Sequence, residues 1–152
     1  MRDAKLGMLT ALAVVAAMAS MTLAASTATT AIKDRQQAME DIGQAMKALG
    51  TIAKKQAPFD AEVVKASAET IADRLEKAAD LFPEGSDTGD VETWAKPEIW
   101  SDAEDFQKHL DTAAAAAVAM QSVTEEAAFG PALGALGTGC KTCHEVYRRP
   151  KQ

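Results

Sequence analysis

The sequence has few of the side chains from which metal and catalytic sites are usually built. Its 152 residues include two cysteines, two histidines and one tyrosine. A structural zinc site takes four ligands, and Cys140 and Cys143 have no second close pair of cysteines or histidines to complete one. Nothing in the sequence places a general base beside a substrate site either, so we expect a protein that is not an enzyme.

Basic residues are also fewer than acidic ones. The formal net charge is −6 at pH 7, and an acidic surface repels the phosphate groups of nucleic acids and of anionic membranes. The charge therefore disfavours both as partners. If the partners are redox proteins, an acidic surface would suit basic ones.

Strand patterns are missing as well. Aromatic residues make up 5% of the chain, and no segment alternates apolar and polar residues for long enough to predict a strand. Alanine is abundant, and such small side chains suit closely packed helices. We expect an all-α protein.

The N-terminal residues 1–25 have the layout of a secretory signal peptide. Arg2 and Lys5 form a short basic head, and residues 6–23 are an uncharged apolar run. An uncleaved membrane anchor is the alternative, because the run nearly reaches spanning length. In either case we expect export, and a cleaved protein would lie in the periplasm. The small residues at which the removed piece could end are Ala24, Ala25 and Ala28.

Cleavage would leave residues 26–152 as one domain. Losing Arg2, Asp3 and Lys5 changes the net charge from −6 to −7. A chain of this length suits one hydrophobic core.

Four segments of the exported chain repeat apolar residues at the three- and four-residue spacing of an amphipathic helix. Pro58 ends the first segment, and residues 82–90 form a loop with one proline and two glycines. Ser101 and Glu104 fit a capping box at the start of the third segment. Helices of this length joined mostly by short connections predict an antiparallel four-helix bundle. The repeating positions are Ile32, Arg35, Met39, Ile42, Met46, Leu49 and Ala53; Val64, Ala68, Ile71, Leu75, Ala78 and Phe82; Ala103, Phe106, Leu110, Ala113, Ala117 and Met120; and Phe129, Leu133, Leu136, Cys140, Cys143 and Tyr147.

The two cysteines fall on the core side of the last segment and are followed directly by His144. The pattern C-x-x-C-H is the attachment signature of c-type haem. Two thioethers one helical turn apart can hold one edge of the porphyrin, and the adjacent imidazole can bind the iron as proximal ligand. We therefore predict one covalent haem, attached through Cys140 and Cys143.

Two other readings of the cysteine pair fit less well. A redox dithiol of the thioredoxin sort lies at the start of a helix after a strand, and no strand is expected here. A disulfide is possible in an exported protein, but this spacing inside a helix would strain the bridge and close a very small loop.

The first segment carries two candidates for the other side of the haem. Arg35 is a charged residue on an apolar seam, and a haem propionate could pair with its guanidinium. The alternative is that its side chain reaches solvent. Met39 lies one turn later, and its thioether can serve as the sixth iron ligand. A methionine on a seam is also a common core residue, as we expect for Met46 and Met120, so both readings of Met39 stay open.

Four stretches together resemble the cytochrome c-prime family, including its low-spin, methionine-ligated c-556 type members. They are "DRQQAMEDIGQAMKALG", "FPEGSDTGD", "KPEIWSDAEDF" and "GCKTCHEVYRR", and with matching helix lengths they cover essentially the whole exported chain. The resemblance implies a four-helix bundle with one haem, commonly a homodimer formed through the first two helices. The stretch "VETWA", residues 91–95, departs from the family by lengthening a loop.

The resemblance also implies roles for individual residues. Arg35 and Gln36 would lie by a haem propionate, and Asp90 would approach the haem edge. Arg148 matches a basic residue near the proximal imidazole. Met39 falls on the distal position, which holds either a ligating methionine or a bulky side chain that blocks the iron.

Three functions follow for testing. The first is a periplasmic electron carrier with six-coordinate iron, bound by His144 and Met39. The second is a five-coordinate haem protein that binds nitric oxide or carbon monoxide. The third is a haem-free dithiol protein. The spare histidine, His109, stands beside Lys108 and is expected on a solvated helix face.

Overall fold

The computed structural model describes the backbone of residues 4–150 and the side chains of residues 27–150. The predicted signal peptide, residues 1–25, lies outside the residues whose side chains are described, so its cleavage stays a prediction. Among the described residues, no helix is both long and apolar enough to span a membrane. The elements are α1 (Ala4–Ala53), α2 (Ala61–Ala78), the short 3₁₀ helix η1 (Ala79–Leu81), α3 (Glu98–Ser101), α4 (Ala103–Met120) and α5 (Glu126–Tyr147).

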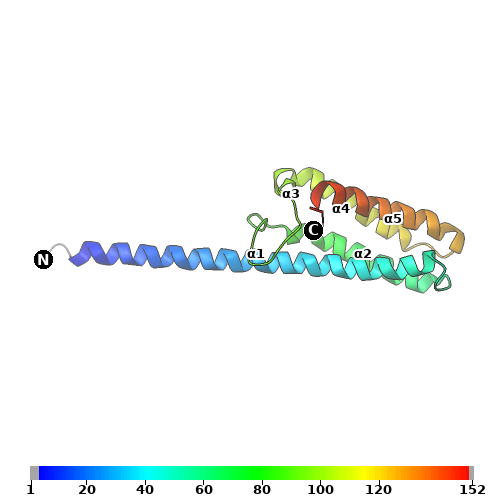
Figure 1. Ribbon diagram of the computed structural model, residues 1–152, viewed down its shortest axis with the longest axis horizontal. Coiled ribbons are helices and arrows are strands. Elements are labelled where there is room, and N and C mark those ends of the chain that lie inside the picture. Colours follow the sequence, from blue (N-terminus) through cyan, green and yellow to red (C-terminus); the bar gives the residue numbers. More distant parts are fainter. Residues whose placement is uncertain (1–3, 151–152) are drawn as a thin grey trace.

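The long helices confirm the predicted antiparallel four-helix bundle (Figure 1). Helix α1 packs on α2, α2 on α4, and α4 on α5. In the described part of the chain, α1 and α5 make no backbone packing of comparable extent. The bundle is therefore closely packed along three seams; we call the fourth, between α1 and α5, the open seam because the two backbones do not pack closely there.

The predicted apolar seams supply the core. Each helix contributes side chains from one face, as expected for amphipathic helices around a single core. The fully buried large side chains include Ile32 and Leu49 on α1, Val64 and Ile71 on α2, Met120 on α4 and Leu136 on α5. Met120 is thus a core residue, as expected.

Two helix boundaries differ from the sequence prediction. The second helical segment ends at Ala78 and continues only as η1, so Phe82 lies just past the helix. The predicted capping box at the third segment is wrong: Asp102, not Ser101, caps α4 and accepts a hydrogen bond from the Asp105 backbone amide at 3.3 Å. Asp102 has φ −133° and ψ 57°, which separates the single turn of α3 from α4.

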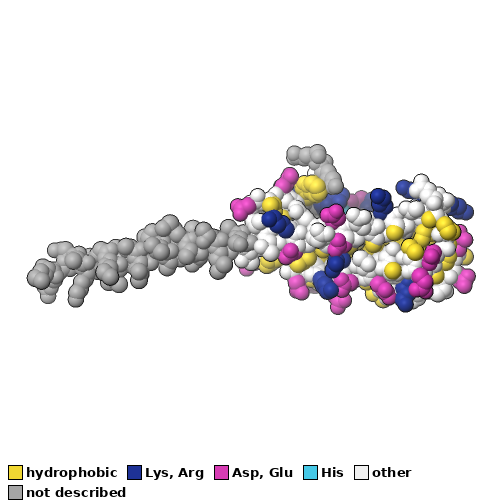
Figure 2. Space-filling model, turned by 90° about the horizontal axis from the view of Figure 1, so that it is seen from below, with side chains coloured by type: hydrophobic (Ala, Val, Ile, Leu, Met, Phe, Trp, Pro, Cys, Tyr) yellow, Lys and Arg dark blue, Asp and Glu magenta, His cyan; other side chains and the backbone are white. Residues whose placement is uncertain are grey.

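The charges on the surface are mixed. Figure 2 shows acidic and basic side chains interspersed over the viewed face, without a continuous basic area. The described large hydrophobic side chains left exposed are single residues on separate elements, Val63, Trp94, Val118 and Val146. On the viewed face, the acidic side chains are therefore not gathered into one patch.

Candidate haem site

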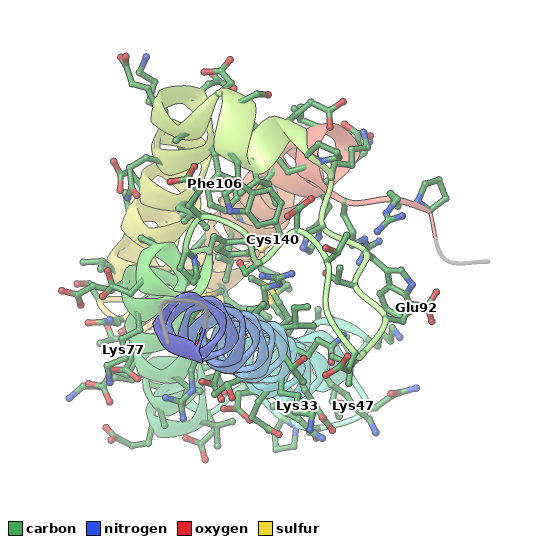
Figure 3. The ribbon with its side chains drawn as sticks, turned by 90° about the vertical axis from the view of Figure 1, so that its left-hand side faces the viewer. Lys33, Lys47, Lys77, Glu92, Phe106 and Cys140 are labelled. Carbon is green, nitrogen blue, oxygen red and sulfur yellow. The ribbon has the colours of Figure 1, made fainter. Side chains whose placement is uncertain are left out.

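Cys140 and Cys143 lie one turn apart on α5 and are half-buried against the hydrophobic core. Figure 3 shows Cys140 in the interior of the bundle, between α5 and α1. Both cysteines are free thiols, so the structure does not support the disulfide reading. They also stand near the C-terminal end of a long helix, unlike the helix-start position of a thioredoxin-type dithiol.

Both thiols are held in their protonated form. Burial raises the pKa of the Cys140 thiol, and burial together with the neighbouring Cys140 raises the pKa of the Cys143 thiol to about 11. Thioether formation adds the sulfur and the hydrogen of each S–H group to the two carbons of a vinyl double bond, and two free thiols one helical turn apart supply both. The residues present therefore fit covalent attachment of a porphyrin edge.

His144 follows in the last turn of α5 and is half-buried. Burial lowers the pKa of its imidazole, and the positive charge of Arg148 lowers that pKa further. A neutral imidazole offers a free ring nitrogen, which is what an iron ligand requires. Arg148, whose expected place was near this imidazole, caps the helix through its backbone amide, which donates to the His144 carbonyl at 3.1 Å.

Gly139, immediately before the first cysteine, lets α5 approach α4 closely. A Cβ atom at this position would lie 3.1 Å from the Cα and 3.4 Å from the Cβ of Ala113 on α4. The sequence presented this glycine only as a weak helix former. Its structural reason is the close contact that fixes the attachment helix against its neighbour.

Tyr147 secures the same helix one turn after His144. Its buried ring packs edge-on against Phe106, with 5.1 Å between centroids, and its hydroxyl donates to an Asp105 carboxylate oxygen at 2.5 Å. Burial and the Asp105 carboxylate raise the pKa of Tyr147. His109 is not on a fully solvated face as expected: it is half-buried, with its ring 5.5 Å from the Tyr147 ring, because α5 packs beside it.

On the opposite wall, α1 presents Met39 at the edge of its buried stripe. Met39 is half-buried and packs against the core, and Met46 occupies the equivalent place two turns later. The interior side of α1 thus carries a thioether on the helix that faces α5 across the open seam. The expected distal position is compatible with this placement, while iron ligation stays a prediction.

Arg35, one turn before Met39, does not reach solvent. It is 4% exposed, and its guanidinium donates to the Ser86 hydroxyl at 3.0 Å, the Ser86 carbonyl at 2.7 Å and the Thr93 hydroxyl at 2.9 Å. The guanidinium also lies 5.0 Å from the Phe82 ring centroid. Burial lowers the pKa of Arg35, and Asp87 offsets part of that effect. The solvent alternative is therefore wrong, and the contacts seen are to the chain itself.

Gln36 and Asp90, the other residues expected at the haem edge, also form hydrogen bonds that join α1 to the loop. Gln36 donates from its side-chain amide to the Glu92 carbonyl at 2.7 Å. The Asp90 backbone amide donates to the Thr29 hydroxyl at 3.1 Å. Their roles toward a haem stay predictions, and the structure places them beside the end of the bundle where Arg35 lies.

Several residues of this region were not singled out from the sequence. Ser86 and Thr93 are buried polar residues in the connection between η1 and α3, and Lys96 donates from its ammonium group to the Val146 carbonyl at 2.7 Å. In the sequence, only the charge of Arg35 on an apolar seam indicated that hydrogen-bond acceptors must lie nearby. Nothing local in the sequence identified which residues supply them.

Metal ligation by protein side chains alone is not supported. Among the described residues, no group of three or more His, Cys, Asp or Glu side chains is placed to hold a metal ion. The zinc reading therefore finds no support, and two thiols beside an imidazole on one helix fit a porphyrin edge and its iron instead.

Comparisons with known proteins agree with this geometry. A family model described as cytochrome C' matches residues 30–148. The cytochrome c' of Pararhodospirillum photometricum is 42% identical over 77 residues, which cover 49% of this chain and 61% of that protein. A cytochrome c-556 of Agrobacterium fabrum is 40% identical over 75 residues, covering 47% of this chain and 49% of that protein. The chain spans about half the length of the curated relatives it matches.

Solved structures extend the similarity to the whole bundle. Cytochrome c' from Rhodopseudomonas palustris superposes with a TM-score of 0.77 at 36% identity, covering 80% of this chain and 98% of that one. A cytochrome c' described as showing ligand-controlled dimer dissociation superposes with a TM-score of 0.75 at 31% identity, covering 81% and 97%. Proteins of this kind carry one covalently bound haem c per chain, which the C-x-x-C-H residues of α5 fit. The chain belongs to the cytochrome c' family.

Proposed function

We propose that this protein is a periplasmic electron carrier with one haem, whose iron is bound by His144 and Met39. The observation that supports the proposal is that the two candidate ligands stand on neighbouring helices whose backbones do not pack closely on each other. His144 comes from α5 and Met39 from the interior side of α1, and these two helices are the neighbours that do not pack closely on each other. A flat cofactor between them would have one candidate ligand on each side.

The haem iron supplies one-electron chemistry, changing between its ferric and ferrous forms. Cys140 and Cys143 would hold the porphyrin edge on α5, and the adjacent His144 on the same helix would bind the iron. Its lowered pKa keeps the imidazole neutral and able to donate an electron pair. A thioether ligand from Met39 would favour the ferrous form and raise the reduction potential. No proton has to move with the electron in this scheme.

The test compares Met39→Ala with Met46→Ala in the haem-loaded protein. Both methionines are half-buried on the same edge of α1, so both variants lose similar packing, but only Met39 is expected to be an iron ligand. Met39→Ala should convert low-spin iron to high-spin iron and allow carbon monoxide to bind. Met46→Ala should keep the parent spectrum. Low-spin iron that survives in Met39→Ala would overturn the proposal.

A five-coordinate protein that binds nitric oxide or carbon monoxide is the second candidate. Met39 packs against the hydrophobic core, which also suits a side chain that fills the distal side of a haem without binding its iron. High-spin iron in the unaltered protein, with carbon monoxide binding that Met39→Ala accelerates only by opening the pocket, would support this function.

The remaining parts of the proposal follow from the family and the sequence. Arg35 and Gln36 would lie by a propionate, Asp90 near the haem edge, and Arg148 beside the proximal imidazole. The protein would be exported by its signal peptide, would not be an enzyme, and would form a homodimer through its first two helices. Size-exclusion chromatography with light scattering on the haem-loaded protein tests the dimer, which should have twice the mass of one chain.

A further inference from the structure

The connection between η1 and α3, residues 82–97, lies across the open side of the bundle; we call it the strap. Figure 3 looks along the bundle and shows this segment, with Glu92, on the side away from α2 and α4. Its buried polar side chains, Ser86 and Thr93, point to a specific attachment rather than a loose loop. The strap therefore stands where α1 and α5 lack direct packing.

Arg35 attaches the strap to α1. Its three hydrogen bonds of 2.7 to 3.0 Å all end on Ser86 and Thr93, and a longer contact of 3.5 Å reaches the Leu81 carbonyl. All four acceptors are uncharged. Losing these acceptors would leave a buried guanidinium unpaired, which is energetically costly. The hydrogen bonds therefore stabilise both the position of Arg35 and the position of the strap.

The attachment continues along one face of α1. Thr29 bonds to Asp90 through both the Asp90 backbone amide, at 3.1 Å, and its carboxylate, at 3.3 Å. Gly89 lies so close to α1 that a Cβ atom there would be 2.8 Å from the end of the Ile32 side chain. These contacts recur at intervals of one helical turn and lead directly toward Met39, so the strap covers the part of α1 just before the proposed ligand.

The other edge of the strap is attached to the end of α5. The Lys96 amide donates to the Tyr147 carbonyl at 3.0 Å, and the Arg149 amide donates to the Trp94 carbonyl at 2.7 Å. The Lys96 ammonium group donates to the Val146 carbonyl at 2.7 Å, which satisfies a backbone acceptor at the helix end. This is the last turn of the helix that carries His144.

Thr93 joins the two attachments in a single residue. Its hydroxyl accepts from Arg35 of α1 at 2.9 Å, and its carbonyl accepts from the Arg149 guanidinium just beyond α5. The helix with the proposed distal ligand and the helix with the proximal ligand are thus linked through one threonine. This link lies in "VETWA", residues 91–95.

We propose that Arg35 and Thr93 are positioning residues that set the spacing between α1 and α5 and thereby hold Met39 on the iron. The inference rests on the proposed function in one respect, the ligation of iron by Met39. It requires no propionate contact from Arg35.

The test uses Thr93→Val in the haem-loaded protein, which keeps the shape of the side chain and removes the hydroxyl acceptor. Thr93→Ser restores the hydroxyl and should behave like the parent. Thr51→Val is the matched control, because the Thr51 hydroxyl bonds only to the Lys47 carbonyl within α1. Hydrogen exchange at the amides of Lys96 and Arg149 should become about tenfold faster in Thr93→Val, since a hydrogen bond to a charged group is lost.

A second readout separates positioning from mere stability. Thr93→Val should increase the high-spin fraction of the iron and speed carbon monoxide binding by about tenfold, a change that corresponds to one lost charged hydrogen bond. Thr93→Ser and Thr51→Val should leave both unchanged. Ser86→Ala, which removes the other hydroxyl acceptor of Arg35, should shift both readouts in the same direction as Thr93→Val.

Each contrary outcome has a distinct meaning. Unchanged exchange in Thr93→Val would overturn the attachment itself and would favour a propionate as the main partner of Arg35. Faster exchange with unchanged spin state and carbon monoxide binding would overturn the positioning role. If Met39→Ala shows that Met39 is not a ligand, the proposed function fails separately, and faster carbon monoxide binding in Thr93→Val would still support control of the helix spacing by the strap.

Discussion

Helices α5 and α1 face each other across the haem site but are held in place by different means. Helix α5 is fixed by direct packing: Gly139 lies against Ala113, and Tyr147 packs on Phe106 and bonds to Asp105. Helix α1 packs on α2, but on the side of the haem site it is held by the hydrogen bonds of Arg35 to the strap. A close-packed contact has little freedom, whereas a few polar contacts to a loop can open locally. We therefore expect a rigid proximal wall and a more adjustable distal wall.

The largest expected effect is on the proximal wall. Replacing both Cys140 and Cys143 by serine removes the two sulfur atoms that form thioethers, so covalent haem should be lost completely. Haem staining of the denatured protein checks this, and Met39→Ala serves as the control that should keep its stain. Covalent haem in the double variant would refute attachment through α5, and its absence from the unaltered exported protein would favour the dithiol reading.

The packing of the proximal wall predicts a second, smaller effect. Gly139→Ala places a methyl group 3.1 Å from the backbone of Ala113, so one of the two helices must shift, at a cost of about 1–3 kcal/mol in unfolding free energy. Gly137→Ala is the control on the same helix, because nothing lies within 4 Å of its Cβ position; it should gain up to about 1 kcal/mol from helix propensity. Equal midpoints in urea unfolding of the haem-loaded variants would contradict close packing at Gly139.

The smallest effect concerns Tyr147 and alkaline pH. The pKa of Tyr147 is raised in the folded protein by burial and by Asp105, while an unfolded chain has a tyrosine pKa of about 10. Above that value the unfolded state releases the proton first, so stability contributed by the neutral hydroxyl is lost as pH rises.

Tyr147→Phe should therefore unfold at lower urea than the parent at pH 8 but lose less stability between about pH 9.5 and 11. Unfolding midpoints measured across this range check the difference in slope. Parallel slopes for the two proteins would show that the Tyr147 hydroxyl is not held neutral by the fold.

The two walls also differ in how far the sequence revealed them. The proximal site was predictable because Cys140, Cys143 and His144 belong to one short motif on one helix. The bundle was predictable because the periodicity of the four apolar seams is a local property of the sequence. The partners of Arg35 were not predictable, since Ser86 and Thr93 lie more than fifty residues away and carry no local pattern. The capping residue of α4 was missed because the turn at α3, set by tertiary contacts, moved the helix start by one residue.

Arg35 shows what sequence reasoning can and cannot provide. A charge on an apolar seam correctly indicated a buried guanidinium in need of acceptors. The sequence suggests a propionate or solvent as the partner of Arg35, and the strap is a third partner that only the fold reveals. The same reasoning explains Gly139, whose close contact with α4 depends on a neighbouring helix and leaves no trace in the residues around it.

The central claim is that His144 and Met39 bind the same iron from opposite walls, and the absorption spectrum of the exported haem-loaded protein, oxidised and then reduced, tests it most directly. The account predicts sharp, split visible bands on reduction and a methionine–iron charge-transfer band when oxidised, with no change on addition of carbon monoxide. Broad high-spin bands that sharpen when carbon monoxide is added would contradict ligation by Met39 and leave the protein as a gas-binding member of its family.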